Sequence, residues 1–327
     1  MRLTQAQKYE IIRLVERSEL SAKRTLAELG IERSTFYRWY ARYLEFGYDG
    51  LARQQRPRQP VWNEISLDRK QEIVELALDF PELSSRELAW KMVDQRDYFV
   101  SESSVYRLLK ARGLVTSPAF ALEKAADKFH QPTQRINQLW QTDFTYLKIV
   151  HWGWYYLSTI LDDFSRYIIC WRLCTTMGAD DVEDTINLAL EKTGIPRKKR
   201  PKLLSDNGPC YISHNLAEYL ETEKIVHIRG RPHHPQTQGK IERYHRSMKN
   251  IIKLEYYYSP EHLKQAVGEF VQYYNYHRYH EALDNLTPAD VFYGRGEQIR
   301  KRREKIRSQT MRKRRKAWQR KKRLLHS

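Results

Sequence analysis

The spacing of apolar residues changes near residue 137, and this change limits which folds the chain can adopt. Upstream, apolar residues recur at helical spacing in short segments that glycines terminate. Downstream, three segments rich in aromatic and β-branched residues follow one another, after which helical and strand-like segments alternate. This order predicts a multidomain chain, in which all-α units precede an α/β domain built on a mixed five-stranded sheet.

Shifts in composition give the expected domain boundaries. The expected segments are a helical unit (1–50), a Pro/Arg linker (51–66), a second helical unit (67–116), a polar connector (117–136), the α/β domain (137–293) and a basic tail (294–327).

Each helical unit resembles a helix-turn-helix, because its last helix opens with polar and basic residues that could enter a DNA groove. The two units share this helix-turn-helix pattern, without a strict sequence repeat. A small helical bundle with no DNA role is the alternative. The candidate DNA contacts are Arg33, Ser34, Thr35 and Arg38 in the first unit, and Ser103, Ser104 and Arg107 in the second.

Three acids lie in distinctive positions of the α/β domain. Asp143 is in the first expected strand (139–150), Asp206 follows the fourth (202–205), and Glu242 is in an expected helix (239–254). Strand ends and helix starts are where such a sheet gathers polar groups. Carboxylate oxygens suit Mg²⁺, and two ions about 3.5–4 Å apart can clamp a phosphodiester for in-line displacement. Other aspartates, including Asp162 and Asp163, are expected to be caps or surface ion-pair partners.

The helix around Glu242 adds a second argument. Glu242, Arg246 and Lys249 share one face at spacings of four and three, beside a face that includes His245 and can pack. A phosphate held near Glu242 would place its neighbours along this basic face. Lys240, just before Glu242, is a further candidate DNA contact. The alternative is an ordinary Glu–Arg surface pair.

The positive charge of the chain is concentrated at its end. Residues 295–327 contain 16 Lys/Arg and 2 Glu, which is most of the formal net charge of +18. Such a tail is typical of a phosphate-binding arm, although a solvated terminus or a surface for an acidic partner is an alternative. The chain has 3 cysteines and no long apolar run, so we expect a reducing, cytoplasmic location and no membrane partner.

The α/β segment resembles the integrase-type catalytic core of bacterial insertion-sequence transposases, which are related to retroviral integrases. The matching motifs are Trp140-x-x-Asp143-x-Thr145, Asp206-Asn207-Gly208, His234-Pro-Gln-x-x-Gly239-Lys-Ile-Glu242-Arg243, and Tyr274-Asn275-x-x-Arg278-x-His280 with Pro288 downstream. The resemblance implies a ribonuclease H-like fold with Asp143, Asp206 and Glu242 as ligands of two Mg²⁺ ions, for which Mn²⁺ can substitute. It also implies DNA contact by Lys249.

The resemblance implies an enzyme that cleaves DNA strands and joins them to a target. The helical units would bind terminal inverted repeats, since the paired His/Cys zinc domain of retroviral integrases is absent from the sequence. Joining two DNA ends implies a homodimer or a higher homo-oligomer. The alternatives are a hydrolytic nuclease of the same fold and a DNA-binding regulator with a silent core.

Overall fold

The computed structural model describes residues 3–18, 20–52, 61–114, 133–230, 239–252 and 256–324. These residues form two compact units, Met1–Glu64 and Ile65–Ser327. Most of the expected linker and connector, residues 53–60 and 115–132, lies outside the described residues, as does the 234–238 part of the third motif.

The first unit is a small helical domain whose helices match the expected ones. Its elements are α1 (Gln5–Arg17), α2 (Ala22–Glu28), α3 (Arg33–Phe46) and a 3₁₀ turn (Gly47–Leu51). Ile12, Leu26, Phe36 and Leu51 form its buried centre, with tyrosine rings packed around them. Gly30, with φ of 65°, makes the left-handed turn between α2 and α3, which a glycine adopts without strain.

The second unit begins with another helical domain. It contains α4 (Leu67–Asp79), α5 (Ser85–Arg96) and α6 (Glu102–Ala111) around a core that includes Ile73, Met92 and Val105. Ser84 and Glu87 form a reciprocal capping box at the start of α5.

The α/β domain has the predicted five-stranded mixed sheet, in the order β3-β2-β1-β4-β5. The strands are β1 (Leu139–Ile149), β2 (Gly153–Asp162), β3 (Ile168–Cys174), β4 (Lys202–Ser205) and β5 (His227–Arg229). The first three pair antiparallel, and β4 pairs parallel with both β1 and β5. This mixture follows from the chain order, because hairpins join the first strands and helices join the later ones.

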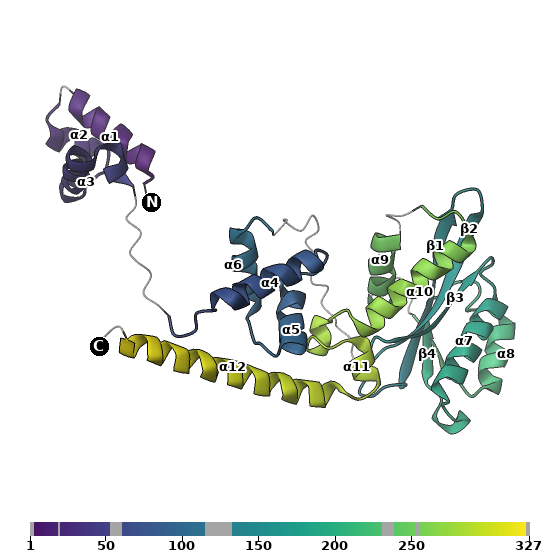
Figure 1. The fold of residues 1–327 in the computed structure, drawn as a ribbon. Coiled ribbons are helices and arrows are strands. Elements are labelled where there is room, and N and C mark those ends of the chain that lie inside the picture. The colour runs from purple at the N-terminus through teal and green to yellow at the C-terminus, as the bar shows by residue number, and fades with distance from the viewer. Residues whose placement is uncertain are drawn as a thin grey trace. The chain divides into compact units, whose positions relative to one another are not determined.

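Helices cover both faces of this sheet (Figure 1). They are α7 (Ala179–Thr193), α8 (His214–Thr222), α9 (Gly239–Ile252), α10 (Pro260–Tyr276) and α11 (Pro288–Phe292), with 3₁₀ turns at Arg197–Lys199 and Glu281–Leu283. One core packs the sheet against α9 and α10, and the other packs it against α7 and α8. All three cysteines are buried, as expected. No described helix is long and apolar enough to cross a membrane.

The basic tail forms one continuous helix, α12 (Gly296–Leu324), drawn in yellow in Figure 1. Its first half is not an exposed arm, because Arg303, Ile306 and Thr310 are buried. α12 contacts α5, so the tail packs on the second helical domain.

Candidate active site

The sheet brings two of the acids level with each other. Asp143 lies in β1, and its side chain is 21% exposed. Asp206 directly follows β4, which runs parallel to β1 with Gln141 opposite Leu204. Continuing that register by two residues sets Asp206 beside Asp143. The two acids therefore lie at the same level of two neighbouring inner strands, although they are far apart in the sequence.

A tight turn holds Asp206. The backbone N–H of Gly208 donates to its Oδ1 at 2.9 Å, and the Asn207 side chain donates to the Gly230 carbonyl at 2.8 Å. A Cβ atom added at Gly208 would lie 3.0 Å from Oδ1 of Asp206, closer than most Cβ contacts. The Asp-Asn-Gly motif thus combines an acid, a tether to the next strand, and a residue small enough to let the carboxylate approach.

The third acid is positioned by a buried network beneath the start of α9. The backbone N–H of Ile241 donates to Oε1 of Gln141 at 3.1 Å, and Nε2 of Gln141 donates to Oδ1 of Asp163 at 2.7 Å. Nζ of Lys240 donates to Oδ2 of Asp163 at 2.7 Å, and the Asp163 side chain is only 1% exposed. These contacts attach the first turn of α9, which carries Glu242, to β1 and to the end of β2.

This network corrects two expectations. Asp163 is buried rather than a surface ion-pair partner. Asp162 is buried too, and accepts from the Asn137 N–H at 2.7 Å and from the N–H and hydroxyl of Ser165 at 2.8 and 2.6 Å. Burial raises the pKa of Asp162. Both acids are internal because backbone and side-chain donors satisfy them, which their position after an apolar strand did not reveal.

The charge of Asp143 affects the pKa of each of the other two acids. Burial, and then the nearby charge of Asp143, raises the pKa of Glu242. The pKa of Asp206 is raised by burial and by Asp143, against the lowering effect of the Gly208 hydrogen bond. Asp143 is thus close enough to both acids to disfavour their ionisation, which is the arrangement that a bound cation would relieve.

The donor chemistry of this triad fits Mg²⁺, since all three side chains offer hard oxygen ligands. Within the part of the chain that the structure describes, no group of three or more His, Cys, Asp or Glu side chains is gathered closely enough to hold a metal ion. The three acids are neighbours around Asp143 without forming such a group.

His245 is a site residue that the sequence interpretation assigned only to packing. Its side chain is buried, and its Nδ1 lies 3.3 Å from Oδ2 of Asp143. Its Nε2 is buried without a hydrogen-bond partner among the described residues. The signal in the sequence is the spacing of three from Glu242, which brings the two side chains to the same side of a helix.

The candidate DNA contacts on α9 are divided by the structure. Arg246 is exposed, while the ammonium group of Lys249 lies 4.4 Å from the ring centroid of Tyr146, an exposed side chain three residues beyond Asp143. Lys240, expected to contact DNA, instead donates to the buried Asp163. Arg246 and Lys249 therefore remain on the surface near the triad, and Lys240 anchors the helix.

The expected recognition positions lie at the starts of α3 and α6. Arg33, Ser34, Arg38, Ser103 and Arg107 are exposed, while Thr35 and Ser104 are half-buried. The two helices share the pattern Ser-x-apolar-Tyr-Arg, at 34–38 and 103–107. This short repeat is confined to the recognition positions. In both, the apolar residue is buried, and the tyrosines, Tyr37 and Tyr106, are exposed.

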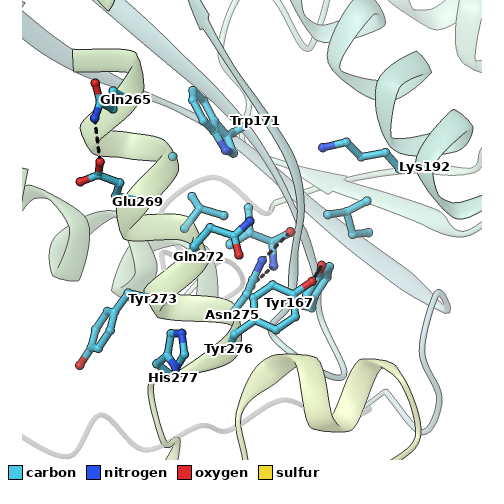
Figure 2. Close-up of a pocket in the computed structure, with 14 residues that line it drawn as sticks. Tyr167, Trp171, Lys192, Gln265, Glu269, Gln272, Tyr273, Asn275, Tyr276 and His277 are labelled. Carbon is cyan, nitrogen blue, oxygen red and sulfur yellow. Dashed lines mark hydrogen bonds between the residues drawn. The ribbon is translucent and has the colours of Figure 1, made fainter. Parts of the chain in front are cut away.

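One hollow of the α/β domain lies away from the acids. This cavity of about 600 Å³ lies between β3 and α10, and Figure 2 shows the side chains that line it, among them Trp171, Gln272 and Asn275. None of the triad lines it.

Comparison with known proteins agrees with this geometry. Residues 133–235 and 223–288 match the integrase core domain, and residues 2–52 and 35–109 match the homeodomain-like domain. Over 135 residues, 38% of this chain, it is 32% identical to the Gag-Pro-Pol polyprotein of mouse mammary tumor virus. Over 268 residues, 73% of this chain, it is 26% identical to the transposase for transposon Tn552 of Staphylococcus aureus.

These relatives are longer proteins. The matches span 7% of the viral polyprotein and 54% of the Tn552 transposase. Among solved structures, the HTLV-2 integrase catalytic core domain in complex with magnesium aligns with 48% of this chain and 97% of its own, at 20% identity and a TM-score of 0.39.

Proposed function

Because the chain carries an integrase core domain together with homeodomain-like helical domains, we propose that it is a DNA transposase, a polynucleotidyl transferase that cleaves DNA strands and joins them to a target. The observation that carries the proposal is the placement of Asp206 and Glu242 near Asp143, whose charge adds to the effect of burial in raising the pKa of each. A buried network holds the helix that bears Glu242, which supports a role that needs this acid in a fixed place.

Asp143, Asp206 and Glu242 would hold two Mg²⁺ ions, which when bound supply charge stabilisation to a phosphodiester and lower the pKa of water. His245 would keep the Asp143 carboxylate oriented. In the first step water attacks a phosphodiester and releases a 3′-OH. In the second, that 3′-OH attacks a target phosphodiester, so that one P–O bond forms and one breaks, and the target strand leaves with its own 3′-OH. Arg246 and Lys249 would bind neighbouring phosphates.

The helical domains would recognise the terminal inverted repeats. The exposed N-terminal residues of α3 and α6 support this, because such residues reach base edges when a recognition helix enters the major groove. The exposed lysines and arginines in the second half of α12 would add sequence-independent phosphate contacts. Two DNA ends joined in one complex require at least two protomers.

The test is a strand-joining assay with a labelled terminal-repeat duplex, a target plasmid and Mg²⁺. The wild type should cleave the end and join it to the plasmid, and Asp206→Asn should do neither while still binding the duplex. Asp184→Asn is a matched control, because it is the same Asp-to-Asn change at an exposed residue that pairs with Arg172. Cleavage that survives Asp206→Asn overturns the assignment of the site.

The two alternatives give different results in the same assay. A hydrolytic nuclease would nick DNA without joining it, and would need no repeat sequence. A DNA-binding regulator would bind the repeats and cleave nothing at any metal concentration. Joining that depends on both the repeat and the metal separates the transposase from both.

A further inference from the structure

One buried arginine joins three parts of the second unit. Arg303, on α12, is 6% exposed. Its Nε and Nη2 donate to the two carboxylate oxygens of Asp94 on α5, at 2.9 and 2.7 Å. Its Nη1 donates to the carbonyl of Asn285, in the segment between α10 and α11, at 3.0 Å. A single guanidinium thus contacts the second helical domain and the α/β domain at once.

The surroundings of Arg303 fix its orientation. The guanidinium lies 4.5 Å from the ring centroid of Trp90, and the hydroxyl of Tyr279 donates to the same carboxylate of Asp94 at 2.8 Å. A bidentate Arg–carboxylate pair stacked on an aromatic ring allows one relative orientation, which a lysine cannot reproduce.

Contacts along α12 extend this junction. The backbone N–H of Phe99 donates to the hydroxyl of Thr310 at 3.1 Å, and Nη2 of Arg314 donates to the Tyr98 hydroxyl at 2.7 Å and the Phe99 carbonyl at 2.9 Å. From Arg303 to Arg314 the helix advances about 17 Å, so the docked surface spans about three turns. Arg303 is buried and Arg314 half-buried in this packing, and the exposed Arg302 adds a bond to Asp97 at 2.9 Å.

The α/β domain has a second direct link to the same helical domain. Arg86, near the start of α5, donates to Glu281 at 2.7 Å. This pair is exposed and contributes little stability by itself. Together with the Arg303 junction, it gives α5 two attachment points on the segment between α10 and α11.

We propose that Arg303 is a positioning residue, which holds the second helical domain at a set distance from the acidic triad and so determines which phosphodiester is cleaved. The inference rests on the proposed function. α6 belongs to the helical domain that Arg303 holds. The junction contacts the segment that follows α10, and α10 packs in the same core as α9. DNA bound through α6 would present one phosphodiester to the triad while the junction is intact, and several when it is loosened.

The experiment maps cleavage at single-nucleotide resolution on an end-labelled repeat duplex, using the full-length protein. The wild type should cut at one phosphodiester. Arg303→Met should spread cleavage over neighbouring bonds and slow cleavage at the original bond at least about tenfold, because small displacements of reacting groups have large effects on rate. Affinity for the duplex should be unchanged. Arg303→Lys should behave like Arg303→Met, since it keeps the charge and loses the bidentate geometry.

Lys301→Met is the matched control, because it removes one charge from the same helix at an exposed pair with Glu297. It should cut like the wild type. A folded Arg303→Met protein that cuts the original bond alone, at the wild-type rate, overturns the inference. If the wild type itself cleaves no repeat duplex, the proposed function fails instead, and the two results are distinct.

A cross-link tests the same idea without removing Arg303. Phe99→Cys with Thr310→Cys introduces two thiols at positions that already meet, because the backbone N–H of Phe99 donates to the Thr310 hydroxyl at 3.1 Å. The oxidised protein should retain single-site cleavage, because the docked arrangement is the active one. Loss of cleavage on oxidation, with recovery on reduction, would show that the helix has to undock for activity and would overturn the proposal even if Arg303→Met fails to fold.

Discussion

Nδ1 of His245 lies 3.3 Å from Oδ2 of Asp143. His245 is on α9, the helix that also carries Glu242. The imidazole is buried, so it can hold the carboxylate in one orientation. Mutation of a residue that orients a metal ligand typically lowers metal affinity or activity by about 10–100-fold. We therefore expect His245→Gln to lower metal-dependent cleavage by about tenfold or more, with unchanged binding of repeat DNA, measured by single-turnover cleavage and by fluorescence anisotropy.

His214→Gln is the control for this change, since His214 is exposed and pairs only with the exposed Glu218. It should cleave like the wild type. Equal activity of the two variants would show that His245 is a packing residue alone.

Gly208 permits the close approach of Asp206. A Cβ at this position would lie 3.0 Å from Oδ1 of Asp206, whereas a Cβ at Gly178 would lie 3.8 Å from its nearest neighbour, Oδ2 of Asp181. Gly208→Ala should displace the carboxylate and reduce cleavage strongly, without a large change in the free energy of unfolding. Gly178→Ala should leave cleavage intact. Full activity of Gly208→Ala would mean that the carboxylate has room to move without consequence.

The raised pKa values of Asp206 and Glu242 give the triad a pH dependence. A carboxyl group with a raised pKa takes up its proton at a higher pH than usual, and a protonated carboxyl does not bind a cation. Affinity for Mn²⁺, measured by calorimetry, should therefore begin to fall at a higher pH than it would for carboxyl groups with the ordinary pKa of about 4. Glu242→Gln should bind more weakly and depend less on pH. Constant affinity down to about pH 4 would contradict the coupling of the three acids.

The network under α9 contributes to stability as well as to placement. Asp163→Asn leaves the ammonium group of Lys240 partly buried without its charged partner. Breaking a buried ion pair in this way should lower the free energy of unfolding by about 3 kcal/mol, measured by denaturant titration. Asp184→Asn breaks an exposed pair with Arg172, so its effect should stay below about 1 kcal/mol. Similar losses in the two variants would show that the Lys240 pair is solvent-screened.

The sequence predicted the elements of the α/β domain well, because alternating aromatic and β-branched residues distinguish its strands from the helices that follow. It did not predict which charged side chains are internal. Asp163 meets Lys240 across 77 positions, and Asp94 meets Arg303 across 209. Nothing in local spacing encodes such pairs, because they depend on how the elements pack.

The tail illustrates the same limit. Its arginines are alike in composition, and a cationic segment is typical of a phosphate-binding arm. Arg303 and Arg314 are instead at least half-buried and bonded to the second helical domain. Arg302 is exposed, yet it also donates to Asp97 of that domain. The packing of α12 on α5 thus engages arginines that composition alone would assign to a phosphate-binding arm.

The central claim, that Asp143, Asp206 and Glu242 form one metal-dependent site, is tested most directly by anomalous diffraction from crystals of the protein grown with Mn²⁺ and a repeat duplex. The account predicts anomalous peaks among the three carboxylates, with a DNA phosphate beside them, and no peaks there in Asp206→Asn. Manganese bound elsewhere, with the three carboxylates unligated against the DNA, would contradict it.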